Sequence, residues 1–182
     1  MAKYVAFLRG INVGGNKIIK MEDLKKVFQS MEFQNVQTLL ASGNVIFETS
    51  EKDSGKLTRW IGEATKKAFG HDISVIVRSI DEIKKLIESN PFKEIKVTPQ
   101  TRLYVTFLGE NKKSKLKIPY QTPEKDFKIL SLSDSEVCSV VVLSPNKKSV
   151  DLMKIIEKEF GKNPNLKKLY SKNGFVFFVR MP

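Results

Sequence analysis

The stretch "YVAFLRGINVGGNK", residues 4–17, joins an apolar run to a glycine-rich loop near the start of the chain. The run "KYVAFLR" at residues 3–9 is rich in strand-forming residues and too short for a buried helix, so it predicts a β-strand. Apolar residues then recur at helical spacing from Lys20 to Met31, which predicts an amphipathic helix with one buried face. The glycine-rich loop therefore leads from a strand into a helix.

The N-terminal half continues with the same two kinds of pattern. Residues 36–40 and 45–48 predict two strands joined by a turn at "ASGN", a second helix ends at Gly70, and residues 73–78 predict a further strand. The order strand, helix, strand, strand, helix, strand is that of the ferredoxin-like βαββαβ unit, whose helices cover one face of the sheet. Ser79 and Glu82 then form a capping-box pattern for a linking helix that buries Ile83, Leu86 and Ile87.

The C-terminal half resembles the N-terminal half in local sequence and in the order of its apolar patterns. The matching pairs are "YVAFL" at 4–8 with "YVTFL" at 104–108, "AFG" at 68–70 with "EFG" at 159–161, and "VIVR" at 75–78 with "FFVR" at 177–180. Between them lie patterns for two strands and a helix, at 127–132, 137–143 and 150–160. Repeated order together with repeated sequence favours a duplicated unit, and chance matching of short apolar strands is the alternative.

The expected architecture is therefore an α+β protein with two tandem ferredoxin-like units and antiparallel sheets. The first unit spans residues 1–79, a linking helix and linker span 80–100, and the second, more basic unit spans 101–182. The first strand is apolar on both of its faces, and helices cover only one face of such a sheet. Its second face needs a cover, so we expect the units to pack sheet to sheet or the protein to form a homodimer. A protein-protein interaction module that uses this apolar face is a further hypothesis for the function.

The charge of the chain favours an anionic partner, and its composition points to the cytoplasm. The formal net charge is +12, divided as +3 over residues 1–91 and +9 over residues 92–182. Such a balance suits nucleotides, nucleic acid or acidic proteins, although a lysine-rich solvated surface would give the same count. The single cysteine, Cys138, lies in an apolar stretch typical of a buried strand, and no signal peptide or membrane span is recognisable.

The predicted topology places three loops at one end of the first sheet, because its strands alternate in direction. These loops are residues 10–17, 42–44 and 70–72, and a glycine-rich loop before a helix can present backbone N–H groups to an anion. The alternative is that the glycines only supply turn conformations. The residues predicted to bind a ligand are Arg9, Gly10, Asn12, Gly14, Gly15, Asn16, Lys17, Ser42, Gly43 and Asn44.

Catalysis is a second hypothesis for the same loops. His71 is the only histidine and would serve as a proton shuttle, and Ser42, His71 and Asp72 form a weakly supported trio. One histidine and one cysteine argue against a zinc site, and the sequence does not identify a cofactor, which stays unknown. A separate stretch, "KNGFVFFV" at 172–179, resembles an aromatic RNA-binding strand but also fits a core strand. Whether the protein is an enzyme stays open at this point.

The same loops carry a resemblance to a known family. The stretches "YVAFLRGINVGGN", "KMEDL", "ASGNVIFE", "VRS", "NPF" and "YVTFL" resemble the bacterial family called domain of unknown function 1697, over about residues 3–108. The resemblance implies a small cytoplasmic α/β protein without an established activity, and it supplies no catalytic residues. The C-terminal segment "NPNLKKLYSKNGFVFFVRMP" departs from the ending that many relatives share.

Overall fold

The chain divides into two compact units, residues 1–85 and 86–182, which are described separately below. The computed structural model describes residues 1–12, 17–39, 43–109, 116–143, 158 and 165–169. The α+β class and the antiparallel pairing of the strands are as the sequence predicts. Among the described helices, none is long and apolar enough to cross a membrane.

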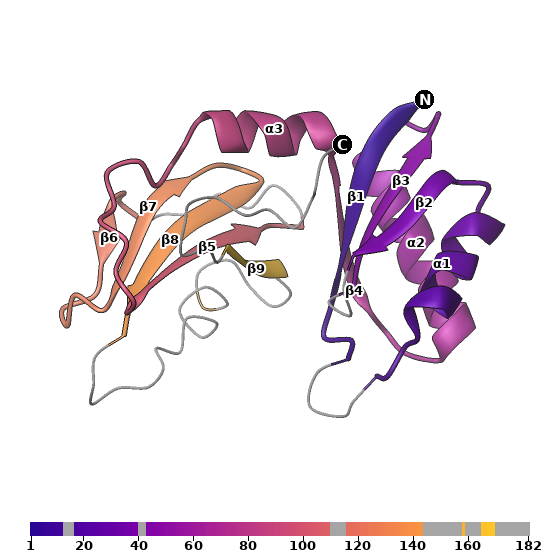
Figure 1. Ribbon diagram of the computed structural model, residues 1–182, viewed down its shortest axis with the longest axis horizontal. Coiled ribbons are helices and arrows are strands. Elements are labelled where there is room, and N and C mark those ends of the chain that lie inside the picture. Colours follow the sequence, from indigo (N-terminus) through magenta and orange to yellow (C-terminus); the bar gives the residue numbers. More distant parts are fainter. Residues whose placement is uncertain (13–16, 40–42, 110–115, 144–157, 159–164, 170–182) are drawn as a thin grey trace. The chain divides into compact units, whose positions relative to one another are not determined.

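The N-terminal unit has the element order expected from the sequence. Its elements are β1 (Ala2–Arg9), α1 (Met21–Ser30), β2 (Gln34–Leu39), β3 (Asn44–Thr49), α2 (Ser54–Phe69) and β4 (Ser74–Ser79). The sheet has the strand order β2-β3-β1-β4, and every neighbouring pair is antiparallel. Both helices lie on one side of this sheet (Figure 1). The predicted central position of the first strand, beside the third, is confirmed.

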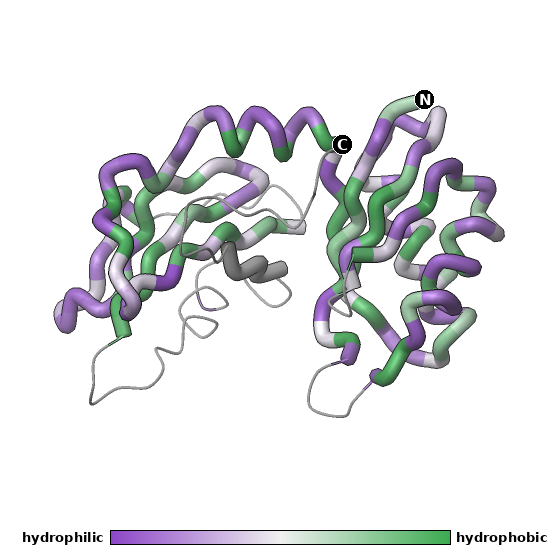
Figure 2. The backbone as a smooth tube through the Cα atoms, viewed as in Figure 1, coloured by the Kyte–Doolittle hydropathy of each residue, from purple (hydrophilic) through white to green (hydrophobic). Residues whose placement is uncertain are grey.

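The core of this unit lies between the sheet and its two helices. Alternate residues of β1, including Ala6 and Leu8, pack in one cluster with Phe28 of α1 and Ile61 of α2. Figure 2 shows hydrophobic residues concentrated along the strands, and hydrophobic and hydrophilic residues alternating along the helices. Val5 and Phe7, which point to the face of β1 away from the helices, are buried as well. Both faces of β1 are thus withdrawn from solvent, as its apolar sequence predicts.

The ends of the helices follow local capping rules. The Asp53 side chain accepts a hydrogen bond from Lys56 N at 3.0 Å at the start of α2, and Gly70 ends the helix in the left-handed conformation. The predicted capping box begins α3 (Ile80–Glu88): Glu82 N donates to Ser79 Oγ at 3.1 Å, and Ser79 N donates to the Glu82 carboxylate at 2.7 Å.

The C-terminal unit contains a sheet of five strands with the order β6-β7-β8-β5-β9. Within it, the order β7-β8-β5-β9 repeats the order β2-β3-β1-β4 of the first sheet. One backbone hydrogen bond recurs too, because Leu8 N donates to Gly43 O and Leu108 N donates to Ser135 O, both at 2.8 Å. The strands are β5 (Thr101–Phe107), β6 (Tyr120–Gln121), β7 (Phe127–Leu132), β8 (Glu136–Val142) and β9 (Asn165–Leu169).

The second half also differs from the expected pattern in two places. Between β5 and β7, the described residues form the short strand β6 and no helix. The strand beside β5 is β9, whereas the closing strand was expected at 177–180, which lies outside the described residues together with the stretch at 172–179. The expected helix at 150–160 also lies outside them, apart from Lys158.

Cys138 is buried in β8, as its apolar surroundings predict. Its side chain is 1% exposed, and burial raises the pKa of its thiol to about 11. A thiol held in this protonated state is a poor nucleophile, because the thiolate is the reactive form. Cys138 is therefore a core residue of the C-terminal unit.

Candidate functional site

Three loops of the N-terminal unit meet at one end of its sheet, as the predicted topology requires. The glycine-rich loop contacts the connection between α2 and β4, because Lys17 Nζ donates to Asp72 O at 2.7 Å. The end of β1, just before this loop, contacts the turn between β2 and β3, because Leu8 N donates to Gly43 O at 2.8 Å. We call this end of the sheet, with Arg9–Asn12, Lys17–Lys20, Gly43–Asn44 and Gly70–Asp72, the loop edge.

Asn12 closes the glycine-rich loop with both ends of its side-chain amide. Its Oδ1 accepts from Ile19 N at 2.7 Å, and its Nδ2 donates to Ile19 O at 3.0 Å. Its backbone N–H also donates to Lys17 O at 3.1 Å, and its φ is 56°. Asparagine tolerates this left-handed conformation better than most residues. The structure thus gives Asn12 a structural role in joining the two ends of the loop.

The glycine-rich loop (residues 9–17) and the turn at residues 42–44 carry the family resemblance, and we call them the signature loops. They approach each other closely at Gly43, which lies against Ile11. A Cβ atom at this position would lie 2.7 Å from Ile11 Cδ1 and 3.1 Å from Leu8 Cβ. The backbone φ of Gly43 is +72°, a conformation that residues with a side chain resist. Ile11 is 2% exposed, so it has little freedom to move aside. Glycine is therefore required here by both backbone conformation and packing.

The charges at the loop edge are arranged around Asp72. Lys66 Nζ lies 2.9 Å from Asp72 Oδ1, so Lys66 pairs with the carboxylate and Lys17 contacts only the backbone oxygen. The hydrogen bond from Lys66 is the main cause that lowers the pKa of Asp72, and the charge of Lys17 adds to it. Arg9, Lys17, Lys66 and Asp72 together carry a net positive charge. The loop edge therefore keeps a positive field despite its ion pair.

Arg9 and Asn44 lie on the sheet face opposite the helices. Leu8 and Val45 belong to the core under the helices, and neighbouring strand residues point to opposite faces. Asn44 is paired with Phe7 across β1 and β3, and Arg9 is paired with Ser74 across β1 and β4. Arg9, Asn44 and Ser74 are each half-buried. The loop edge and the adjoining start of β4 thus present a cation, an amide and a hydroxyl on one face of the sheet.

Comparison with known proteins identifies the family of the chain. The sequence profile of DUF1697, a protein family of unknown function, matches residues 1–138. The chain belongs to the DUF1697 family. The conserved bacterial protein SP0830 from Streptococcus pneumoniae has a similar fold, with a TM-score of 0.69, 16% sequence identity and 92% of each chain covered. No curated protein is significantly similar to the chain in sequence.

The two signature stretches of this DUF1697 protein are in contact, and their residues differ in role. Asn12 and Gly43 hold the loops together, whereas Arg9, Lys17 and Asn44 are half-buried at the edge. Gly10 is exposed with a φ of +74°. Gly14, Gly15, Asn16 and Ser42 lie outside the described residues. His71 is exposed on the connection between α2 and β4, beside the Lys17 contact at Asp72.

Three residues that matter at the loop edge of the DUF1697 protein are absent from the predicted set. Ile11 packs against Gly43, Ile19 makes both hydrogen bonds with the side chain of Asn12, and Ile18 is 77% exposed. The apolar pair Ile18–Ile19, placed between a glycine-rich loop and a helix, is the only sequence signal for the latter two. Nothing in that pair indicates which isoleucine is buried, because the choice depends on the Asn12 hydrogen bonds.

Proposed function

We propose that the loop edge binds an anionic ligand, a nucleotide or a nucleic acid, through residues 9–17 and 42–44. The observation that carries the proposal is the hydrogen bond from Lys17 Nζ to Asp72 O, which holds a cation of the glycine-rich loop at the loop edge, against the connection between α2 and β4. A lysine bonded to a neutral carbonyl keeps its charge available to a second acceptor. The net charge of +12 acts in the same direction by attracting anions to the protein.

The residues of the loop edge have complementary roles in this proposal. Arg9 would bind phosphate oxygens with two parallel N–H groups, whereas Lys17 would act as a compact charge. Asn44 lies on the same sheet face as Arg9 and would orient the ligand by hydrogen bonding. Asn12 and Gly43 would keep the loops in place without touching the ligand. An enzyme that uses His71 has less support, because the His71 side chain is exposed and the neighbouring Asp72 carboxylate is paired with Lys66.

The experiment that tests the proposal is binding to labelled oligonucleotides and nucleotides over a series of salt concentrations. Phosphate contacts make log affinity fall linearly with log salt, and the loss of one contact lowers the slope by about 1. We expect Arg9→Gln and Lys17→Gln each to weaken binding and to reduce this slope. Absence of binding to both classes of ligand at low salt would contradict the proposal.

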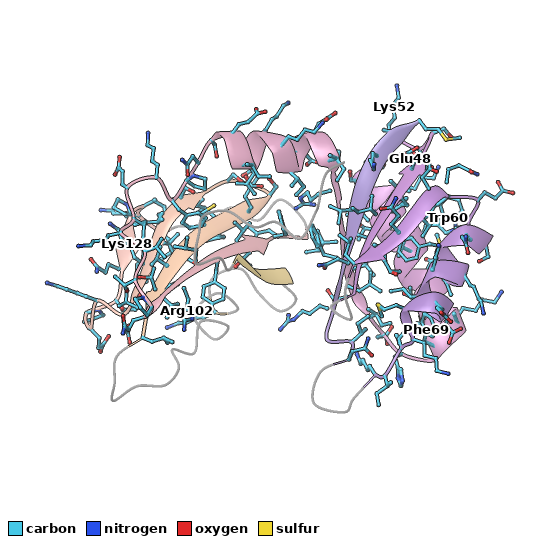
Figure 3. The ribbon with its side chains drawn as sticks, in the orientation of Figure 1. Glu48, Lys52, Trp60, Phe69, Arg102 and Lys128 are labelled. Carbon is cyan, nitrogen blue, oxygen red and sulfur yellow. The ribbon has the colours of Figure 1, made fainter. Side chains whose placement is uncertain are left out.

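Lys52→Gln is the matched control for these substitutions. Lys52 is an exposed lysine of the same unit, but it follows the end of β3 and so lies at the opposite end of the sheet from the loop edge (Figure 3). Its substitution removes the same charge from the protein as Lys17→Gln does. An equal loss of affinity in both variants would indicate general attraction by net charge instead of a site at the loop edge.

We also infer that the C-terminal unit is a second ferredoxin-like unit, as the repeated sequence predicts. Two observations support this inference: the strand order β7-β8-β5-β9 and the hydrogen bond from Leu108 N to Ser135 O both have counterparts in the N-terminal unit. The helix that would precede β9 corresponds to α2. Backbone chemical shifts typical of a helix over residues 150–160 would support the duplication, and extended shifts there would contradict it.

A further inference from the structure

Ile18 is the most exposed large hydrophobic residue of the described chain after Met1. Its side chain is 77% exposed, whereas that of the adjacent Ile19 is only 4% exposed. A single exposed aliphatic residue is common on protein surfaces and needs no explanation by itself. The position of Ile18 is what makes it informative, because it lies at the loop edge between Lys17 and the exposed Lys20.

The backbone on both sides of Ile18 is held in place. On one side, Lys17 accepts a hydrogen bond from Asn12 N at 3.1 Å and donates from its side chain to Asp72 O at 2.7 Å. On the other side, Ile19 N donates to Asn12 Oδ1 at 2.7 Å, and Ile19 O accepts from Asn12 Nδ2 at 3.0 Å. These hydrogen bonds hold the backbone of Lys17 and Ile19 on either side of Ile18, which lowers the entropic cost of an interaction there.

The side chains around Ile18 favour one of the two ligand classes in the proposed function, a nucleic acid, over the other, a free nucleotide. Two lysines flanking an exposed aliphatic side chain fit a ligand that offers phosphates and apolar ring faces within a few ångströms of each other. A nucleic acid offers both along its length, and aliphatic side chains are known to enter between neighbouring bases while cations hold the backbone. A free nucleotide has no neighbouring base, so it would leave most of the Ile18 side chain in water.

We infer that Ile18 inserts between neighbouring bases of a bound nucleic acid while Lys17 and Lys20 contact the flanking phosphates. This inference rests on the proposed function and narrows its ligand class to a polymer. Asn12 acts here as a positioning residue, since its amide fixes the backbone that presents Ile18.

The test uses the full chain and a short DNA duplex that carries the fluorescent base 2-aminopurine at a flexible TA step, together with the matching single strand. Base insertion unstacks the fluorescent base, so we expect wild-type protein to raise its fluorescence. Ile18→Ser is expected to abolish that rise and to weaken binding about tenfold, the order expected for losing one aliphatic contact. The salt slope should stay unchanged in Ile18→Ser because no phosphate contact is removed.

Val97→Ser is the matched control, because Val97 is 49% exposed and belongs to the C-terminal unit. Both variants should retain the wild-type thermal unfolding temperature, since both side chains are exposed. Wild-type affinity and fluorescence in Ile18→Ser would overturn the inference and leave the proposed function standing. Binding of ATP without binding of either DNA, or binding only to anionic lipid vesicles, would also overturn it. Absence of binding to DNA and to nucleotides would overturn both the inference and the proposed function.

Discussion

The two units share a strand order, but they differ at one turn. This turn, at Gly43 in the N-terminal unit and Ser135 in the C-terminal unit, is hydrogen-bonded to the end of a central strand. In the N-terminal unit, Leu8 N donates to Gly43 O, and in the C-terminal unit, Leu108 N donates to Ser135 O. Gly43 has a φ of +72° and lies against Ile11. In contrast, the turn at Ser135 is held by a side chain, because Ser135 N donates to Ser133 Oγ at 3.2 Å. The backbone hydrogen bond at this turn therefore does not require a glycine. Gly43 is required because of its backbone conformation and its contact with Ile11 at the loop edge.

The centres of the two sheets differ as well. Tyr4 is paired with Phe47 and stacks on it with 5.9 Å between ring centroids, whereas its counterpart Tyr104 is paired with Ser139. Ala6 has the counterpart Thr106 in the repeated sequence, and both are fully buried. Among the described residues, neither Thr106 Oγ1 nor Ser139 Oγ has a hydrogen-bond partner. At these positions the N-terminal sheet is apolar, whereas the C-terminal sheet buries two hydroxyl groups without hydrogen-bond partners, which costs stability.

Each unit also carries one natural reporter of its own unfolding. Trp60, the only tryptophan of the chain, lies on α2 in the N-terminal unit with its ring edge-on to Phe33 at 5.6 Å (Figure 3). Cys138, the only cysteine, is buried in the C-terminal unit. Tryptophan fluorescence therefore follows the first unit, and the rate of thiol alkylation follows the second. The unfolding of each unit can therefore be followed separately through a residue that the chain already contains.

The largest expected effect is that of Phe47→Ala in the N-terminal core. Phe47 is fully buried and packs against the rings of Tyr4, Phe28 and Phe33, so its truncation should cost about 3 to 5 kcal/mol. Denaturant unfolding followed by Trp60 fluorescence should show this loss. Alkylation of Cys138 under native conditions should stay slow. If Cys138 becomes reactive to the same extent, the two units unfold together and the distinction between them fails.

The second prediction compares the stability cost of Gly10→Ala with that of Gly43→Ala. The difference separates the effect of backbone conformation from that of packing at the loop edge. Gly10 and Gly43 have φ values of +74° and +72°, but a Cβ at Gly10 would meet nothing within 4 Å. Gly10→Ala should therefore cost about 1 to 2 kcal/mol, the penalty of the left-handed backbone alone. Gly43→Ala should cost about 1 to 3 kcal/mol more because of overpacking against Ile11. Equal unfolding free energies for the two variants would show that the Ile11 contact is unimportant.

A smaller effect of opposite sign is expected in the C-terminal unit. Thr106→Val keeps the shape of the side chain and removes a buried hydroxyl without a partner, so it should stabilise this unit by about 1 kcal/mol. The change makes the sheet centre more like that of the N-terminal unit. Slower alkylation of Cys138 in mild denaturant would record the gain. A faster rate would mean that the hydroxyl of Thr106 is satisfied in solution and that the two centres are less different.

The smallest effect is electrostatic and confined to the N-terminal unit. The side chain of Lys56 donates to Glu51 at 2.6 Å, which together with the N–H groups of Asp53 and Lys52 lowers the pKa of Glu51 from 4.5 to about 2. A lowered pKa in the folded state stabilises the protein above pH 4.5, and this contribution disappears as the pH falls towards 2. Lys56→Met should raise the pKa of Glu51, as measured by NMR titration of its carboxyl group. An unchanged pKa would mean that the backbone N–H groups alone set it.

Much of the N-terminal unit follows from sequence because its signals are local. The apolar run of β1, the stop at Gly70 and the capping box at Ser79 each depend on residues a few positions apart. The meeting of the loops follows from strand direction alone. The Asn12 hydrogen bonds do not follow in this way, since they depend on its left-handed backbone and on Ile19 seven residues away. The exposure of Ile18 does not follow from the sequence either, because nothing in the pair Ile18–Ile19 indicates which residue is buried.

The most direct test of the loop edge as the ligand site is NMR mapping of backbone amides during titration with the unlabelled DNA duplex. If the loop edge binds the ligand, the amides of Arg9, Lys17, Ile18 and Asn44 will shift, and those of residues 101–143 will stay in place. Shifts confined to the C-terminal unit, which carries most of the net positive charge, would contradict the assignment of the site.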